Sequence, residues 1–220
     1  MRKILFCGVI LFFSGCTILF PKYFNRKPAS FMIEDLWFTS QLDKNPNVKY
    51  LINTTQKSHF ARRNDFYNQQ LVDFFKDELS QEIYDKSNYK DASGKMIVPV
   101  ILDYNLPKEY KALFQQKTDL DYVVLTKILS ANEINNSNLG QYKNLKYRSN
   151  LLAGSVVFFK IIDVKNNTTA LEISCKSAVY DDLDFNFETN SFEDNGKIVT
   201  HKSEKQLIKK CFKRIFRRIK

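Results

Sequence analysis

Two strand-like segments separated by a short polar linker constrain the fold of this chain most. They cover residues 155–164 and 170–180, and the linker contains Asn166 and Asn167. Asparagine tolerates the left-handed backbone conformation that tight turns need. Apolar and polar residues alternate along the second segment, as they do on the two faces of a strand. The pattern predicts a β-hairpin within a sheet.

The rest of the body predicts helices and further strands. Apolar residues recur at intervals of four over residues 65–84, which is typical of one face of a helix, and Asp65 can cap it. A second helix is predicted over residues 107–116, because Pro107 suits a first helical turn. Strand composition marks residues 31–38, 48–52, 95–103 and 121–130, and a long loop or irregular hairpin is predicted at 181–193.

The order of these elements predicts the fold class. Strand, helix, strand, helix, strand, hairpin and helix follow one another, and the chain is 44% hydrophobic and 26% charged, which is typical of a folded globular protein. We expect one α+β (or α/β) domain over residues 31–220. It should consist of a mixed β-sheet with helices packed mainly on one face.

The N-terminus carries the signals of an exported protein. Two bases precede an apolar run over residues 4–13, which is too short to span a membrane as a helix. Ser14 and Gly15 separate this run from Cys16. The segment resembles the lipobox of bacterial lipoproteins, with Phe13 where leucine is usual.

This resemblance implies a mature chain that hangs from a membrane. Residues 1–15 would be a signal peptide, Cys16 would carry acyl chains such as palmitate, and residues 16–30 would form a tether. Thr17 is not the aspartate that retains lipoproteins at the inner membrane of enteric bacteria, so we expect the periplasmic face of the outer membrane. The alternative is an ordinary secretory signal that is cut elsewhere.

The C-terminus predicts a basic amphipathic helix over about residues 203–220. From residue 202 onward nine bases face one acid, whereas residues 16–201 hold 23 of each. Apolar residues from Leu207 to Ile219 share one helical face. Either this stripe packs on the domain, or it inserts into an anionic membrane. The opposite face is the predicted binding surface for anionic lipid or lipopolysaccharide: Lys205, Lys209, Lys210, Lys213, Arg214, Arg217 and Arg218.

Besides the lipidated Cys16, two cysteines remain in the mature chain, and both fall on predicted apolar faces. Cys175 lies on the second arm of the hairpin, and Cys211 lies in the stripe of the terminal helix. If the helix packs on that sheet face, both sulfurs point into the same layer. An oxidising compartment permits a disulfide between them. The alternatives are two buried free thiols, or a helix that packs elsewhere.

Three short motifs in the body carry a family resemblance: residues 121–125 (DYVVL), 162–165 (IDVK) and 171–174 (LEIS). Together with the final helix, residues 95–180 resemble the small α/β domain shared by the curli-secretion lipoprotein CsgG and the amino-terminal domain of TolB. The family commonly has glycine in place of Thr126 and in the turn at residues 166–167. The resemblance implies a scaffold or assembly component of the envelope, and it supplies no catalytic residue.

Catalytic and metal-binding motifs are absent from the sequence. His59 and His201 are its two histidines, and no nucleophile motif, nucleotide-binding loop or CxxC pair occurs. We therefore expect no cofactor, no metal and no catalytic residue. The favoured function is a non-enzymatic envelope lipoprotein that binds a partner protein. The alternatives are a module that binds anionic lipid or glycan through the basic helix, and an unrecognised hydrolase. Nucleic acid is not an expected partner of an exported lipoprotein.

Overall fold

The computed structural model describes residues 24–38, 47–57, 65–79, 82–85, 93–95, 102–131, 133, 149–182, 184–193 and 198–219. The predicted signal peptide and Cys16 lie outside these residues. So do residues 17–23 of the predicted tether, residues 96–101 of a predicted strand, and His59. No helix of the described part is long and apolar enough to cross a membrane.

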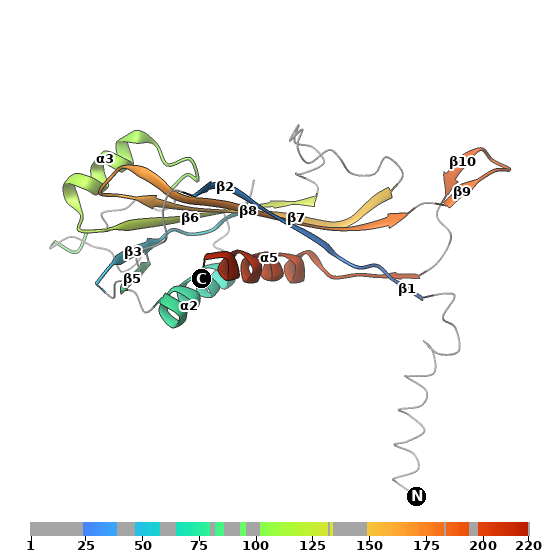
Figure 1. Ribbon diagram of the computed structural model, residues 1–220, viewed down its shortest axis with the longest axis horizontal. Helices are drawn as coiled ribbons and strands as arrows, with labels where there is room; N and C mark the ends of the chain where they lie inside the picture. Colours follow the sequence, from blue (N-terminus) through green and yellow to red (C-terminus); the bar gives the residue numbers. More distant parts are fainter. Residues whose placement is uncertain are drawn as a thin grey trace, which may run out of the picture.

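A seven-stranded mixed sheet forms the centre of the molecule (Figure 1). Its strands are β2 (Ser30–Phe38), β3 (Lys49–Ile52), β4 (Gln56–Lys57), β5 (Glu82–Asp85), β6 (Tyr122–Ser130), β7 (Ser149–Asp163) and β8 (Thr168–Asp182). Their order across the sheet is β2-β8-β7-β6-β3-β5, and β4 pairs with β6. Strands β2, β8, β7 and β6 pair antiparallel, whereas β3 pairs parallel with β6 and β5. The predicted mixed sheet is confirmed.

The predicted hairpin is confirmed as β7 and β8, each of which has 15 residues. The turn between them uses the linker asparagines. Asn166 donates its backbone N–H to the Asp163 carboxylate over 2.9 Å, and Asn167 has a φ of 53°. The arms extend beyond the predicted ends, because residues 149–154 pair with the end of β8.

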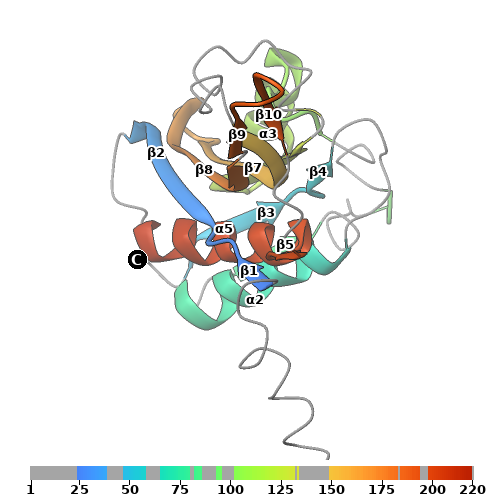
Figure 2. The same cartoon turned by 90° about the vertical axis from the view of Figure 1, so that its right-hand side faces the viewer.

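Helices cover the two faces of the sheet unequally (Figure 2). Helices α2 (Asp65–Leu79) and α5 (Glu204–Ile219) lie on one face, and the shorter α3 (Lys108–Lys117) lies on the other. The larger core joins α2 and α5 to the sheet through Phe75, Phe159 and Phe212, which are all buried. Under α3, a second core surrounds the buried Phe114 and Leu125. The structure is a single α+β domain with an open sheet, as predicted.

The apolar stripe of α5 packs on the sheet. Leu207, Ile208, Cys211, Phe212, Ile215 and Ile219 are all buried. Ser203 caps the N-terminus of α5, close to the predicted start of the helix. Its hydroxyl accepts the Gln206 N–H over 3.4 Å, and its own N–H donates to the Gln206 side chain over 3.1 Å. Of the two alternatives for this helix, packing on the domain is confirmed.

Three predicted boundaries are wrong. Residues 24–26, which the sequence places in the tether, form β1 (Phe24–Arg26), and this strand pairs parallel with β11 (Ile198–Thr200). The helix predicted to end at residue 84 stops at Leu79, and residues 82–85 instead form β5, whose backbone pairs with β3. Leu102, predicted to lie in a strand, instead pairs through its N–H and C=O with the buried Asn53 side-chain amide.

Candidate functional site

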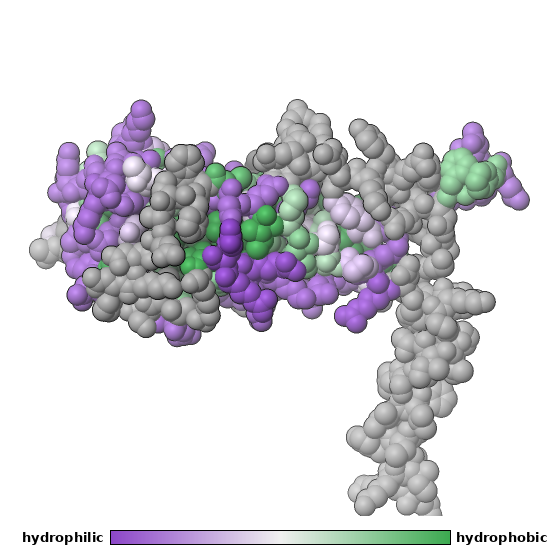
Figure 3. Space-filling model, in the orientation of Figure 1, coloured by the Kyte–Doolittle hydropathy of each residue, from purple (hydrophilic) through white to green (hydrophobic). Residues whose placement is uncertain are grey.

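The basic face of α5 is a continuous exposed surface. All seven predicted bases are exposed, because the stripe that faces the sheet turns them toward solvent. In Figure 3 hydrophilic side chains gather over this helix. The described residues of the basic face are Lys205, Lys209, Lys210, Lys213, Arg214, Arg217 and Arg218.

Strand β2 holds two of these bases in place. The Arg218 Nε donates to Asp35 Oδ2 over 3.0 Å, and this carboxylate raises the pKa of the guanidinium. The guanidinium carbon of Arg214 lies 4.6 Å from the centroid of the Phe31 ring, which is a cation–π distance. These two arginines therefore tie the C-terminal half of α5 to β2.

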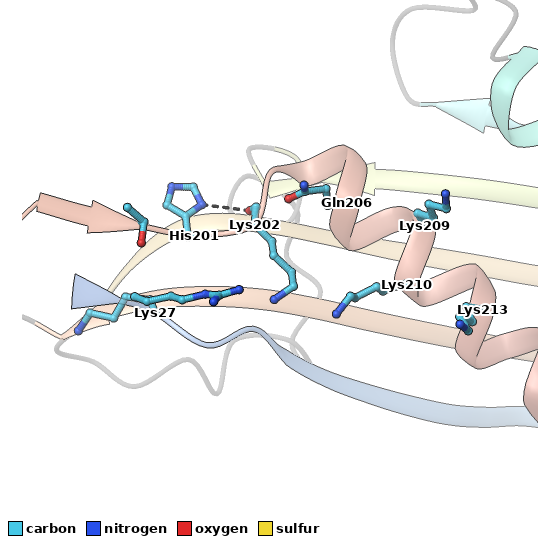
Figure 4. A pocket seen from close by; sticks show the side chains of 9 residues that line it. Lys27, His201, Lys202, Gln206, Lys209, Lys210 and Lys213 are labelled. Atoms are coloured by element: carbon cyan, nitrogen blue, oxygen red, sulfur yellow. Dashed lines mark hydrogen bonds between the residues drawn. The ribbon is translucent and has the colours of Figure 1, made fainter. Parts of the chain in front are cut away.

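The other side of α5 opens into a pocket of about 450 Å³. It lies between the N-terminal half of α5 and the β1–β11 pair, and we call it the basic pocket (Figure 4). Lys202 and Lys210 extend their side chains into the space beside the helix. No carboxylate is among its described lining residues, which are Arg26, Lys27, Thr200, His201, Lys202, Gln206, Lys209, Lys210 and Lys213.

One carboxylate lies close behind the wall of the basic pocket. The Lys27 ammonium forms an ion pair with Asp181 over 2.9 Å, and both side chains are about nine-tenths buried. Within the described ranges, no ion pair joins a carboxylate to Arg26, Lys202 or Lys210. The six bases and this one acid give the pocket a charge of +5. Such a site attracts anions and repels cations.

The sequence predicted only part of this site. Lys209, Lys210 and Lys213 belong to the predicted face, but Arg26 and Lys27 fall in the predicted tether. The parallel pairing of β1 with β11 brings them beside α5. No signal in residues 26–27 indicates this contact, because two adjacent bases are equally typical of a solvated tether.

A second exposed feature is the hairpin of β9 (Asp184–Asn186) and β10 (Ser191–Glu193), which extends beyond the main sheet (Figure 1). It confirms the irregular hairpin predicted in this region. Phe187 is 88% exposed, and its ring meets that of Phe185 edge to face at 5.0 Å. Glu193 accepts hydrogen bonds from Asn186 and the neighbouring hydroxyls, which lower its pKa.

The two cysteines lie together in the core. Cys175 on β8 and Cys211 on α5 are fully buried, so the predicted shared layer is confirmed. Both are free thiols, and the disulfide alternative is therefore not what the structure contains. A thiol–thiol hydrogen bond takes its place. This bond, and then burial, raise the pKa of Cys175.

No group of three or more His, Cys, Asp or Glu side chains that could hold a metal ion occurs among the residues that the structure describes. His201 lies on the wall of the basic pocket, where its Nδ1 is 3.0 Å from the backbone oxygen of Lys202. The features of the described surface that could bind a partner or ligand are therefore its charged groups and its exposed aromatic side chains.

No protein-family model and no curated protein matches this chain. Among solved structures, the PelC dodecamer from Paraburkholderia phytofirmans is similar at 7% identity over 70% of this chain and 83% of that one, with a TM-score of 0.37. The hypothetical protein CT253 from Chlamydia trachomatis is similar at 10% identity, with 79% and 93% covered and a TM-score of 0.36. A putative neuraminyllactose-binding hemagglutinin homolog from Helicobacter pylori is similar at 11% identity, with 81% of each chain covered and a TM-score of 0.32. Similarity at this level does not indicate what this chain binds.

Proposed function

We propose that this chain is a non-enzymatic lipoprotein of the bacterial cell envelope that acts as a scaffold or assembly component by binding a partner protein. Acyl chains on Cys16 anchor it to the periplasmic face of the outer membrane. The observation that carries the proposal is the exposed aromatic pair Phe185 and Phe187 on the β9–β10 hairpin, and this hairpin extends beyond the main sheet (Figure 1).

Exposed aromatic area at the end of a hairpin is an unfavourable arrangement for an isolated domain. Phe187 leaves 88% of its surface in water, although the hydrophobic effect favours its burial. Aromatic side chains are enriched at protein interfaces, where a few of them supply most of the binding energy. In Figure 3 a group of hydrophobic atoms, bordered by hydrophilic ones, is visible on the hairpin. The resemblance of residues 95–180 to the CsgG and TolB domain supports the same role.

The proposal is tested by purifying the acylated protein from its own envelope and measuring which proteins are recovered with it. Phe187→Ser is the test variant. We expect one envelope protein to be recovered with the wild type and at least tenfold less with the variant, since losing a buried aromatic anchor costs about 2 kcal/mol or more. Met32→Ser is the matched control, because Met32 is an exposed apolar residue elsewhere, on β2. Equal recovery with all three proteins would contradict the proposal.

A second candidate function is the binding of an anionic lipid or glycan. The observation that favours it is the basic pocket, which has six bases on its wall and no carboxylate among its described lining residues. Binding through this site should weaken steeply with salt, because exposed charges are screened beyond about 8 Å at physiological ionic strength. An affinity that stays constant with salt would exclude this function.

A further inference from the structure

We propose that the basic pocket binds the phosphate group of an anionic phospholipid in the bilayer that carries the lipid anchor. This inference rests on the lipoprotein anchor at Cys16, and it names the ligand and the site of the second candidate function. It assigns a ligand-binding role to Arg26, Lys202 and Lys210, which come from three separate parts of the fold.

The first argument is the charge of the basic pocket. Its bases surround about 450 Å³, and one of them, Lys27, is neutralised by Asp181 at 2.9 Å. Like charges gathered around one cavity repel each other and oppose the compact state. An anion in the cavity relieves this repulsion and accepts hydrogen bonds from the ammonium groups. The pocket is therefore arranged for an anionic ligand.

The second argument is the kind of anion that these groups recognise. The guanidinium of an arginine such as Arg26 matches two oxygens of a phosphate, and ammonium groups such as those of Lys202 and Lys210 bind the same group as point charges. The volume lies within the usual range for small-molecule sites and exceeds what one phosphate ion occupies. A phosphate joined to its glycerol fits such a space better than a free ion.

The third argument is where the chain enters the fold. Arg26 is ten residues beyond Cys16, and a fully extended segment of that length reaches at most about 35 Å. A lipid on Cys16 would therefore keep the basic pocket close to the bilayer surface. Because the tether holds the pocket near the bilayer, the effective concentration of lipid headgroups at the pocket is high. The phosphates that the pocket meets most often are then the lipid headgroups of the same bilayer. Among these, the anionic lipids lack the headgroup cation that the bases of the pocket would repel.

The fourth argument is the burial of the apolar stripe of α5. Phe212 and Ile215 pack in the core, so they are not available for insertion into the acyl region. Contact with the bilayer through this helix must then occur at the level of headgroups, by charge. Two described pockets border this charged surface, and the other one has Asp73 and Asp77 in its wall. The basic pocket is the one with no carboxylate among its described lining residues.

Binding is tested with the acylated protein in a neutral detergent, titrated calorimetrically with short-chain phosphatidylglycerol. Lys202→Gln/Lys210→Gln should bind about twenty-five-fold more weakly, because each lysine beside a phosphate should strengthen binding about fivefold. The control is Lys108→Gln/Lys117→Gln, which removes the same charge from exposed positions on α3 and should bind as the wild type does. Equal weakening by both double variants would overturn the proposal, because it would indicate general attraction without a site.

Further measurements distinguish a lipid headgroup from a soluble anion as the ligand. Inorganic phosphate should bind far more weakly than phosphatidylglycerol. Phosphatidylcholine should not compete with phosphatidylglycerol for the pocket. Tighter binding of inorganic phosphate than of phosphatidylglycerol would make the ligand a soluble ion and overturn the proposal. In vesicles, lysine-acylation reagents should be excluded from Lys202 and Lys210 only when phosphatidylglycerol is present. If Lys202 and Lys210 were protected only after envelope protein was added, the site would bind a protein partner, and the proposal would be overturned as well.

These outcomes are separate from those that test the scaffold function. Titration with a short-chain lipid does not depend on the anchor, and the Phe187→Ser variant leaves the basic pocket intact. A protein that loses its partner with Phe187→Ser and yet shows no phosphatidylglycerol binding would refute the lipid site alone.

Discussion

Replacing Phe212 with alanine tests the packing of α5, on which the exposure of the basic face depends. Phe212 is 1% exposed, and its ring centroid lies 5.9 Å from that of Tyr67 on α2 and 5.7 Å from that of Phe216. Truncation of a buried phenylalanine to alanine costs about 3–5 kcal/mol. For a chain of this length, the melting temperature should fall by about 6–20 °C, at about 2–4 °C for each kcal/mol.

The assay is thermal unfolding of the acylated protein in neutral detergent, followed by circular dichroism and repeated in urea. Lys213→Ala is the matched control, one residue away on the exposed face, and it should change the free energy of unfolding by no more than about 0.5 kcal/mol. Phe212→Asp should be worse than alanine, because it also buries a charge. If Phe212→Ala melted together with Lys213→Ala, the stripe would not pack on the sheet, and the argument against insertion of α5 would fail.

Three other predictions concern groups that titrate or react. Cys175 and Cys211 should resist thiol reagents in the native protein and react in denaturant, because both are fully buried; rapid modification of either would refute their placement. Cys16→Ala should abolish fatty-acid labelling, and equal labelling of variant and wild type would refute the anchor. Burial, and then the charge of Glu204, raise the pKa of Tyr67, so the folded protein keeps a proton that the unfolded chain loses above pH ~10. Stability should therefore decrease with pH above that value, and Tyr67→Phe should make the decrease shallower in alkaline urea titrations.

Elements with a long regular period were predictable from the sequence. The stripe of α5 and the alternation along β8 follow from helical and strand geometry alone, and Cys175 and Cys211 could be placed in one layer by combining the two. The turn at Asn167 was predictable for a local reason, since few other residues accept its positive φ.

Contacts between the ends of the chain were not predictable. Phe24 pairs with Ile198, and no pattern in either three-residue strand indicates its partner. The basic pocket depends on this pairing, so the sequence found the bases of α5 and missed Arg26 and Lys27. Strand β5 was missed for another reason. Ile83 continues the four-residue spacing of α2, and yet its backbone pairs in register with Tyr50 in the sheet.

Photo-cross-linking in intact cells tests the proposed scaffold function most directly. A photoreactive amino acid in place of Phe187 should form an adduct with one discrete envelope protein, and the same group in place of Lys108, an exposed residue on α3, should not. The adduct should be found in the outer-membrane fraction. An absence of adduct at Phe187, or the same set of adducts at both positions, would contradict the claim that this chain works by docking a partner through its hairpin.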